Sequence, residues 1–134
     1  MIKLKDILLE NQPNIFIPRR LEGRFEKYIQ QYIKNGSKGN LDLSNMNLTK
    51  LPDILKYIKV VGGNFHCGNN NLTSLQGSPE SVGKDFYCSR NNNLISLQGS
   101  PENVGGDFWC RGNKIKFTEQ QVRAICDVKG RVYV

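Results

Sequence analysis

The sequence predicts an α/β solenoid of about four to five stacked parallel strands, with a helical cap before the stack and a helix plus a strand after it. Three observations support this fold. Residues 61–115 contain three copies of one segment, spaced 21 and 22 residues apart. A more degenerate copy precedes them. Segments with helical spacing of apolar residues flank the array on both sides.

Two apolar positions recur in every copy and define a short strand. The first is occupied by Leu41, Phe65, Phe86 and Phe108, and the second by Leu43, Cys67, Cys88 and Cys110. Because successive side chains of a strand point to opposite faces, both positions turn inward and the residue between them faces solvent. Stacking then places equivalent residues about 4.8 Å apart.

Residues 1–37 are expected to form an N-terminal segment and a helical cap. Pro18 stands where a helix can begin, and Asn35 with Gly36 ends the run. The apolar residues with helical spacing are Leu21, Phe25, Tyr28, Ile29, Tyr32 and Ile33. This helix would cover the apolar cross-section at the start of the stack. For residues 1–13 we favour docking or disorder over an amphipathic helix on a partner or a membrane surface.

Residues 38–117 are expected to form the stack itself. Gly62 and Gly63, like the glycine pairs of later copies, occupy a tight corner before the strand. After the strands, inward amides can bond to backbone groups of the following turn. These amides belong to Asn70, Asn91 and Asn113. The QGSP segments at residues 76–79 and 98–101 indicate turn-rich extended chain in place of a longer helix.

Residues 118–134 are expected to form the C-terminal cap, so that the three parts make one structural domain. Thr118 and Gln121 have the spacing of a capping box. The short apolar face that follows consists of Val122, Ile125 and Cys126. A last strand repeats the inward pair through Val132 and Val134, 24 residues after the preceding copy.

These repeats resemble the leucine-rich repeat family, in which alternating apolar residues are followed by Asn and then Leu. The matching segments are Leu41 to Leu43, Phe65 to Leu72 and Phe108 to Ile115. The resemblance covers residues 38–117 and implies the repeat fold. The sequence departs from the pattern in its Phe and Cys residues, in Met46 at the place of the first Asn, and in one extra Asn before Leu94.

The style of the repeats, behind an N-terminal segment that contains IPRR, is more closely similar to small repeat proteins encoded by bacteriophages. This resemblance implies a phage origin and no assigned activity. The expected location is then the cytoplasm of the bacterial host, with the virion as an alternative.

Composition agrees with one small domain outside the membrane. The chain has 134 residues and 38% apolar content, with no apolar stretch long enough to span a bilayer. The apolar run near the N-terminus is too short for a signal-peptide core. The four cysteines form no CxxC pair, and three of them lie in the inward column, so we interpret them as reduced core residues.

The outward position between the two inward residues nominates a candidate surface. It carries Asp42 in the first copy and a ring in each later copy, so rings form an exposed row. Such rows are typical anchors of protein interfaces, since each ring buries a large area with few rotors to freeze. The expected protein-binding residues, with charged neighbours from the flanking columns, are His66, Asp85, Tyr87, Asp107, Trp109, Arg111 and Tyr133.

Two other interpretations of this surface stay open. The rings can stabilise the strands by cross-strand stacking without binding anything. They can also pair two copies of the chain, which would make the protein a monomer or a weak homo-oligomer. In the flanking column, Arg131 falls beside Asp107, where opposite charges on neighbouring strands can pair weakly.

A net charge of +7 and a pI near 9.4 raise a nucleic-acid hypothesis. Most of the excess lies in residues 1–61, which have 11 basic and 6 acidic side chains, a net charge of +5. The candidate phosphate contacts are Arg19, Arg20, Arg24 and Lys27. Glu22 and Glu26 interrupt this cluster, and we favour a solvated helix face over phosphate binding.

Catalysis has little support in the sequence. The single histidine, His66, belongs to no recognisable triad, and no phosphate-binding glycine loop precedes a helix. Asp85 and Asp107 are too few to argue for a calcium site, so no metal or cofactor is expected. The sequence therefore predicts a non-enzymatic protein-binding module. The alternatives are a nucleic-acid-binding accessory protein and a self-associating structural protein.

Overall fold

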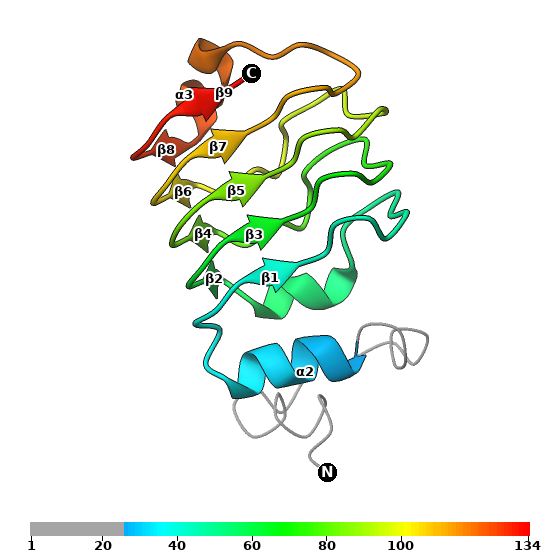
Figure 1. Ribbon diagram of the computed structural model, residues 1–134, viewed down its shortest axis with the longest axis vertical. Coiled ribbons are helices and arrows are strands. Elements are labelled where there is room, and N and C mark those ends of the chain that lie inside the picture. The colour runs from blue at the N-terminus through cyan, green and yellow to red at the C-terminus, as the bar shows by residue number, and fades with distance from the viewer. Residues whose placement is uncertain (1–25) are drawn as a thin grey trace.

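The computed structural model describes residues 26–134. They form an α/β fold with two parallel sheets, between which the chain passes alternately (Figure 1). The five-stranded sheet has the order β1 (Leu41–Asp42), β3 (Phe65–His66), β5 (Phe86–Tyr87), β7 (Phe108–Trp109) and β9 (Val132–Tyr133). The four-stranded sheet has the order β2 (Val60–Val61), β4 (Ser81–Val82), β6 (Asn103–Val104) and β8 (Asp127–Val128). The helices are α2 (Glu26–Lys34), α3 (Glu119–Ile125) and the 3-10 helix η2 (Asp53–Tyr57).

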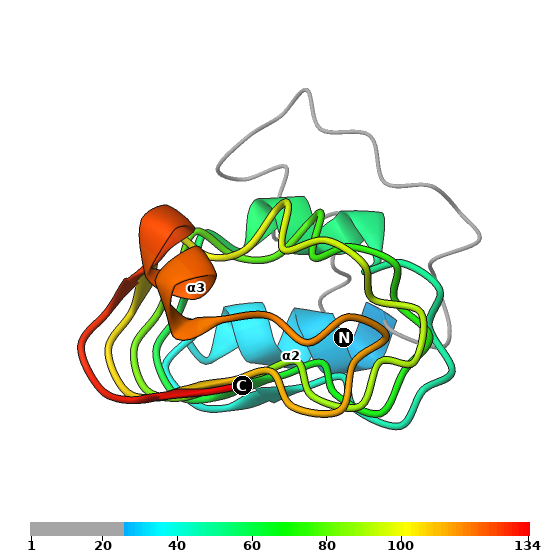
Figure 2. The same cartoon turned by 90° about the horizontal axis from the view of Figure 1, so that it is seen from above.

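The register of the five-stranded sheet places equivalent residues of successive copies side by side. Phe65 pairs with Phe86, and Phe86 pairs with Phe108. Phe108 pairs with Val132, which confirms the predicted fifth strand. Seen from above, successive turns of the chain overlie one another (Figure 2). The predicted row of parallel strands is therefore confirmed.

The four-stranded sheet is an element that the sequence analysis missed. The sequence analysis predicts turn-rich extended chain for the QGSP segments and no strand after them, whereas the structure has β4 and β6 just after these segments. Each strand of this sheet has two residues, of which one is buried. The buried residues are Val61, Val82, Val104 and Val128. One inward valine in a strand of two residues is too short a pattern for period-two alternation to be recognised.

Inward side chains from both sheets meet in one continuous core. Phe65, Phe86 and Phe108 are fully buried. The ring centroids of Phe65 and Phe86 lie 5.7 Å apart, and those of Phe86 and Phe108 lie 4.9 Å apart with an edge-to-face angle of 74°. Burying one such side chain contributes about 1.5–3 kcal/mol. This phenylalanine column fills the core through the central turns.

Glycine at the corners lets successive turns approach closely. Gly62 lies between β2 and β3, and its N–H donates to Ser37 O at 2.7 Å. A Cβ at Gly62 would lie 2.6 Å from Lys38 O, so a side chain would push the turns apart. The predicted tight corner is confirmed here.

The inward asparagines hold neighbouring turns together, as expected. Asn70 Oδ1 accepts from the N–H groups of Met46 and Leu48 at 3.0 Å each. Its Nδ2 donates to Leu43 O at 2.9 Å and to Cys67 O at 3.1 Å. Asn91 and Asn113 repeat part of this pattern one and two turns later. One buried amide thus satisfies backbone groups of two consecutive turns.

We expect Asn70→Ala to lower the free energy of unfolding by about 2–4 kcal/mol, because several buried backbone groups would lose their partner. Urea denaturation followed by circular dichroism measures the change. Asn93→Ala, at an exposed position in the next turn, is the matched control and should change stability by less than about 0.5 kcal/mol. Equal effects of the two substitutions would contradict a structural role for the Asn70 amide.

The helix α2 covers the first turn, as predicted for the N-terminal cap. Ile29 and Tyr32 are buried, and Tyr32 Oη donates to Gly39 O at 2.9 Å. Tyr28 Oη accepts from the N–H of Asp42 in β1 at 2.6 Å. The predicted start of the cap at Pro18 lies outside the described residues. The 3-10 helix η2, which the sequence analysis missed, adds Ile54 and Leu55 to the core.

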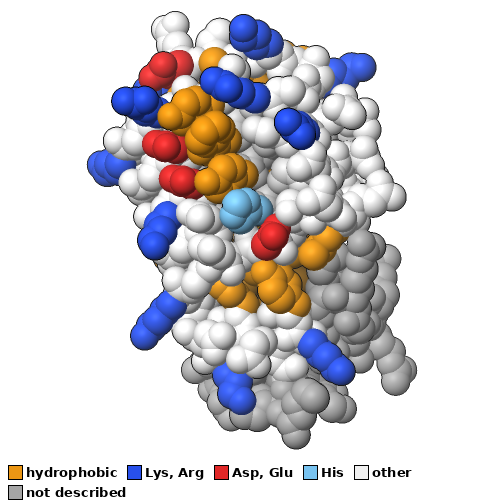
Figure 3. All heavy atoms as spheres, in the orientation of Figure 1, with side chains coloured by type: hydrophobic (Ala, Val, Ile, Leu, Met, Phe, Trp, Pro, Cys, Tyr) orange, Lys and Arg blue, Asp and Glu red, His pale blue; other side chains and the backbone are white. Residues whose placement is uncertain are grey.

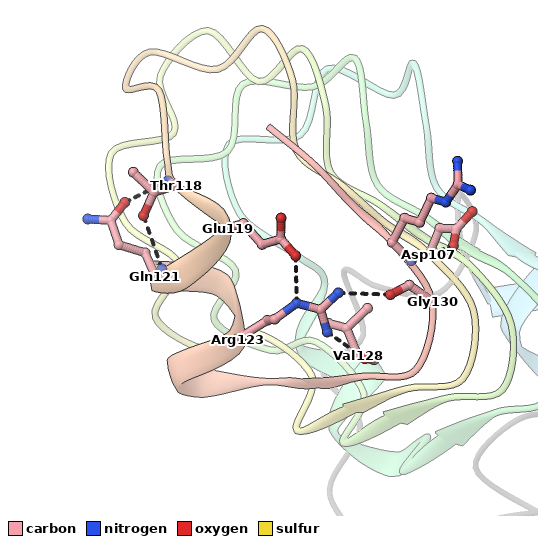
Figure 4. A network of polar contacts seen from close by, with 8 residues as sticks. Asp107, Thr118, Glu119, Gln121, Arg123, Val128 and Gly130 are labelled. Carbon is pink, nitrogen blue, oxygen red and sulfur yellow. Dashed lines mark hydrogen bonds and ion pairs between the residues drawn. The ribbon is translucent and has the colours of Figure 1, made fainter.

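The helix α3 begins with the predicted capping box. Thr118 Oγ1 accepts from the N–H of Gln121 at 3.1 Å, and Gln121 Oε1 accepts from the N–H of Thr118 at 2.9 Å. Arg123 reaches from α3 to the carbonyls of Val128 at 2.8 Å and Gly130 at 2.9 Å (Figure 4). One predicted residue of its apolar face differs, because Ile125 is 48% exposed while Val122 and Cys126 are buried.

All four cysteines are free and buried. Burial raises the pKa of the Cys110 and Cys126 thiols to about 11, and it also raises the pKa values of Cys67 and Cys88. At pH 8 the four thiols are therefore protonated in the folded protein, whereas the thiolate is the reactive form.

We expect a thiol reagent such as DTNB to modify the folded protein slowly at pH 8 and to titrate four cysteines once the chain is unfolded in guanidinium chloride. The absorbance of the released thiolate measures both rates. A cysteine that reacts as fast in the folded protein as in the unfolded chain would show that the core column is open to solvent.

Candidate interaction surface

Four rings form one row across the outer face of the five-stranded sheet. This ring row consists of His66, Tyr87, Trp109 and Tyr133. The ring centroids are 4.3 Å apart for His66 and Tyr87, 5.9 Å for Tyr87 and Trp109, and 3.8 Å for Trp109 and Tyr133. The interplanar angles are 3°, 17° and 14°. The register thus brings together the four predicted rings. Figure 3 shows a contiguous row of orange side chains that continues from the pale blue His on this face.

Stacking determines which part of each ring a partner could contact. Tyr87 and Trp109 each have a ring neighbour on both sides. Only the outer pairs stack closely, at 4.3 Å and 3.8 Å, whereas 5.9 Å separates the centroids of Tyr87 and Trp109. All four side chains are half-buried. The indole N–H of Trp109 is itself buried, and no described residue accepts its hydrogen bond. A neighbouring ring therefore covers one face of Tyr87 and one face of Trp109, and the sides that these two rings turn to each other are covered only in part.

A second column on the sheet ties the turns together through Asn and Asp side chains. Asn40 Oδ1 accepts from the N–H of Asn64 at 2.7 Å, and Asn64 Oδ1 accepts from that of Asp85 at 2.9 Å. Asp85 Oδ1 accepts from the N–H of Asp107 at 2.7 Å, and Asp107 Oδ1 accepts from that of Arg131 at 2.8 Å. We name these four side chains the Asx ladder.

Asp85 and Asp107, which were predicted as protein-binding residues, take part in the Asx ladder. Both lie beside the ring row, as predicted, but one oxygen of each carboxylate bonds to the next turn. The other oxygen of Asp85 accepts from Tyr87 Oη at 3.0 Å. Partial burial, this hydrogen bond and the charges of Asp85 and Asp107 all raise the pKa of Tyr87. The phenol is therefore held as a neutral donor.

Arg131 lies beside Asp107, as predicted, but the predicted pairing of their charged side chains is wrong. No ion pair joins these two side chains, and the contact comes from the backbone N–H of Arg131 instead. Arg111, also a predicted site residue, lies over the Tyr133 ring with its guanidinium carbon 5.3 Å from the centroid. Arg111 is exposed.

The first strand adds a carboxylate to the end of the ring row. Asp42 pairs in register with His66. Partial burial disfavours the charged form of Asp42, but hydrogen bonds from Ser44 and the charge of His66 together hold its pKa below the usual range. Cys67 points to the opposite side of the strand and is fully buried, so Asp42, His66 and Cys67 do not converge as a catalytic triad.

The predicted basic cluster lies mostly outside the described residues. Arg19, Arg20 and Arg24 belong to that part of the chain, and Lys27 is exposed on α2. Within residues 26–134, no group of three or more His, Cys, Asp or Glu side chains could hold a metal ion. None of the helices in this range has the length and apolar character needed to cross a bilayer.

Sequence reasoning missed two hollows in the surface. One has a volume of about 400 Å³ and lies beyond the strand ends, lined by Asn45, Asn47, Asn69, Asn70, Asn71, Arg90 and Asn92. We name it the amide hollow. The other, of about 680 Å³, lies beside α3 and includes Ile95, Phe117 and Ile125. The clustering of Asn after each strand was a signal for the amide hollow, but nothing in the sequence predicted a concave surface there.

Comparison of the chain with family models, with curated proteins and with solved structures finds no match. The surface must therefore be interpreted from its own residues.

We expect Asp107→Asn to leave stability within about 0.5 kcal/mol of the wild type, because the amide oxygen can still accept from the N–H of Arg131. Asp107→Ala removes the acceptor and should cost about 1–2 kcal/mol. Thermal and urea denaturation of the two variants measure this difference. If both substitutions had the same small effect, the Asx ladder would not contribute to stability.

Proposed function

We propose that this chain is a non-enzymatic protein-binding module whose ring row is the contact surface. The observation that carries the proposal is the row itself. It consists of four aligned and half-exposed rings on the outer face of one sheet. Aromatic residues dominate the energetics of protein interfaces because they bury a large area at a small cost in conformational entropy. The partial burial of the rings also fixes their positions before any partner binds.

The proposal includes a leucine-rich-repeat-like solenoid as the scaffold. It is supported by the alternation of the chain between two parallel sheets and by the repeated inward Asn residues. The resemblance to small phage-encoded repeat proteins suggests a phage origin. On that basis, we propose that the partner is a host or phage protein met in the bacterial cytoplasm. Free buried cysteines agree with a reducing compartment.

Self-association is a second candidate function, and one observation favours it. β9 is an edge strand of the described sheet, and it carries the last ring of the row. An edge strand can pair with another strand, including the same strand in a second copy.

The proposed function predicts that Tyr87→Ala combined with Trp109→Ala abolishes partner binding. Wild type and variant would be immobilised and incubated with nuclease-treated bacterial lysate, and mass spectrometry would identify the retained proteins. A purified candidate partner would then be titrated against both by calorimetry. We expect a loss of affinity of at least about thirtyfold, because truncating a central aromatic anchor typically costs 2 kcal/mol or more.

The matched control is Val60→Ala combined with Ile95→Ala, which truncates two exposed apolar residues away from the ring row. This control should bind as the wild type does. Circular dichroism must show that both variants are folded, and Tyr133→Ala in the edge strand serves as a milder substitution if the double variant unfolds. Undiminished binding by folded ring variants would overturn the proposal. Light scattering over a concentration series would reveal self-association through the same surface.

A further inference from the structure

We propose that the protein bound by the ring row presents an acidic segment, whose carboxylates are received by four basic side chains beside the row. This inference rests on the proposed function and names the chemistry of its partner. The four side chains, which we name the basic edge, are Arg90, Arg111, Lys114 and Lys116.

The basic edge follows the ends of β5 and β7. The N–H of Arg90 donates to Arg111 O at 2.8 Å, so their backbones are neighbours across consecutive turns. Arg90 has a φ of 59°, in the left-handed region, and its side chain lies close to Gly112. Lys114 and Lys116 continue the same turn, and all four side chains are exposed. The cations therefore lie along one border of the strand face.

These cations have no acidic partner within the described residues. The ion pairs of residues 26–134 join Arg123 to Glu119 and Lys129 to Asp127. Arg111 contacts the Tyr133 ring, which leaves its charge uncompensated. In the space-filling view, blue side chains lie on both sides of the orange row, and on the right of its upper part no red side chain lies beside them (Figure 3).

The carboxylates beside the row are less available than these cations. Asp85 accepts hydrogen bonds at both oxygens, from Asp107 N–H and from Tyr87 Oη. Asp107 accepts from the N–H of Arg131. A basic partner would therefore compete with bonds that hold the turns together. An acidic partner meets free donors, so charge complementarity favours it.

The amide hollow, which Arg90 of the basic edge lines, offers a binding site for a carboxylate. Arg90 is the single charged residue in its lining, and the other lining residues are asparagines. A carboxylate accepts only, whereas guanidinium and amide groups both carry N–H donors. The amides of Asn45, Asn70 and Asn71 already donate within the protein, so the guanidinium of Arg90 is the main donor of this lining. Hydrogen bonds from a guanidinium to a carboxylate are short, and they are about twice as strong as neutral ones. The volume of about 400 Å³ has room for one acidic side chain and its water.

The same geometry argues against a nucleic acid at this surface. Proteins that bind single strands stack bases on open aromatic faces. In the ring row, His66 stacks on one face of Tyr87 and Tyr133 stacks on one face of Trp109, so these two faces are not open to a base. A phosphate backbone that crossed the row would also approach Asp85 and Asp107. A protein segment can place apolar groups against the ring edges and carboxylates against the basic edge.

The test uses a phage-displayed library of random twelve-residue peptides, selected on the immobilised full-length chain. We expect selected peptides to be enriched in Asp and Glu relative to the unselected library. One enriched peptide, labelled with fluorescein, would be titrated by anisotropy against wild type and variants. Arg90→Glu combined with Arg111→Glu should lower its affinity at least about tenfold. The control, Lys50→Glu combined with Lys59→Glu, has the same change in net charge away from the strand face and should change affinity less than about twofold.

Each other outcome has a defined meaning. The selected peptides could lack an acidic excess, fail to bind the Tyr87→Ala, Trp109→Ala variant and still bind the Arg90→Glu, Arg111→Glu variant. This result would overturn the inference and leave the proposed function intact. Peptides that bind the ring variant as tightly as the wild type, or no enrichment at all, would overturn both. An oligothymidylate of thirty nucleotides should also be titrated. If it bound more tightly than the peptide and depended equally on Arg90 and Arg111, the inferred partner would be a nucleic acid and the acidic protein segment would be ruled out.

Discussion

The fixed parallel register between consecutive turns is the constraint on which the rest of this structure depends. Strands of two residues have little stability alone, and their N–H groups find acceptors on a neighbouring turn, which is the next turn in the five-stranded sheet and the preceding turn in the four-stranded sheet. Phe65 N–H donates to Asp85 O at 3.0 Å, and Phe86 N–H donates to Asp107 O at 2.9 Å. The Asn70 amide and the Asx ladder add side-chain bonds at the same spacing. The phenylalanine column, the ring row and the Asx ladder all result from this one register.

Sequence reasoning could predict what repeats and what alternates. The inward Phe and Cys columns, the outward rings, the capping box at Thr118 and the strand at Val132 all follow from period and register. It failed where the signal is a single residue. The four-stranded sheet has one buried valine in each strand, and η2 is one short turn around Ile54 and Leu55. Neither pattern is long enough to distinguish from loop sequence.

The ring row was predictable as a set of residues but not as a set of interactions. Register alone places the rings in a row and allows them to stack, yet it does not determine the separation and angle of each pair. It also places Asp107 beside Arg131 without revealing that the carboxylate bonds to a backbone N–H. Hydrogen bonds of this kind depend on rotamers and on the local path of the chain, which the residue types do not determine. For this reason the free charge of the surface is found at Arg90 and Arg111.

The copies differ in length by up to three residues, with spacings of 21, 22 and 24, yet the strand register is unchanged. Additional residues are absorbed in the loops beyond the strands, as with the extra Asn before Leu94. One whole turn of the chain is consequently the unit by which the stack can be lengthened or shortened. Gain or loss of one whole turn would lengthen or shorten the ring row by about 4.8 Å and leave the other contacts in place. The reach of such a surface can evolve in discrete steps, by duplication rather than by substitution.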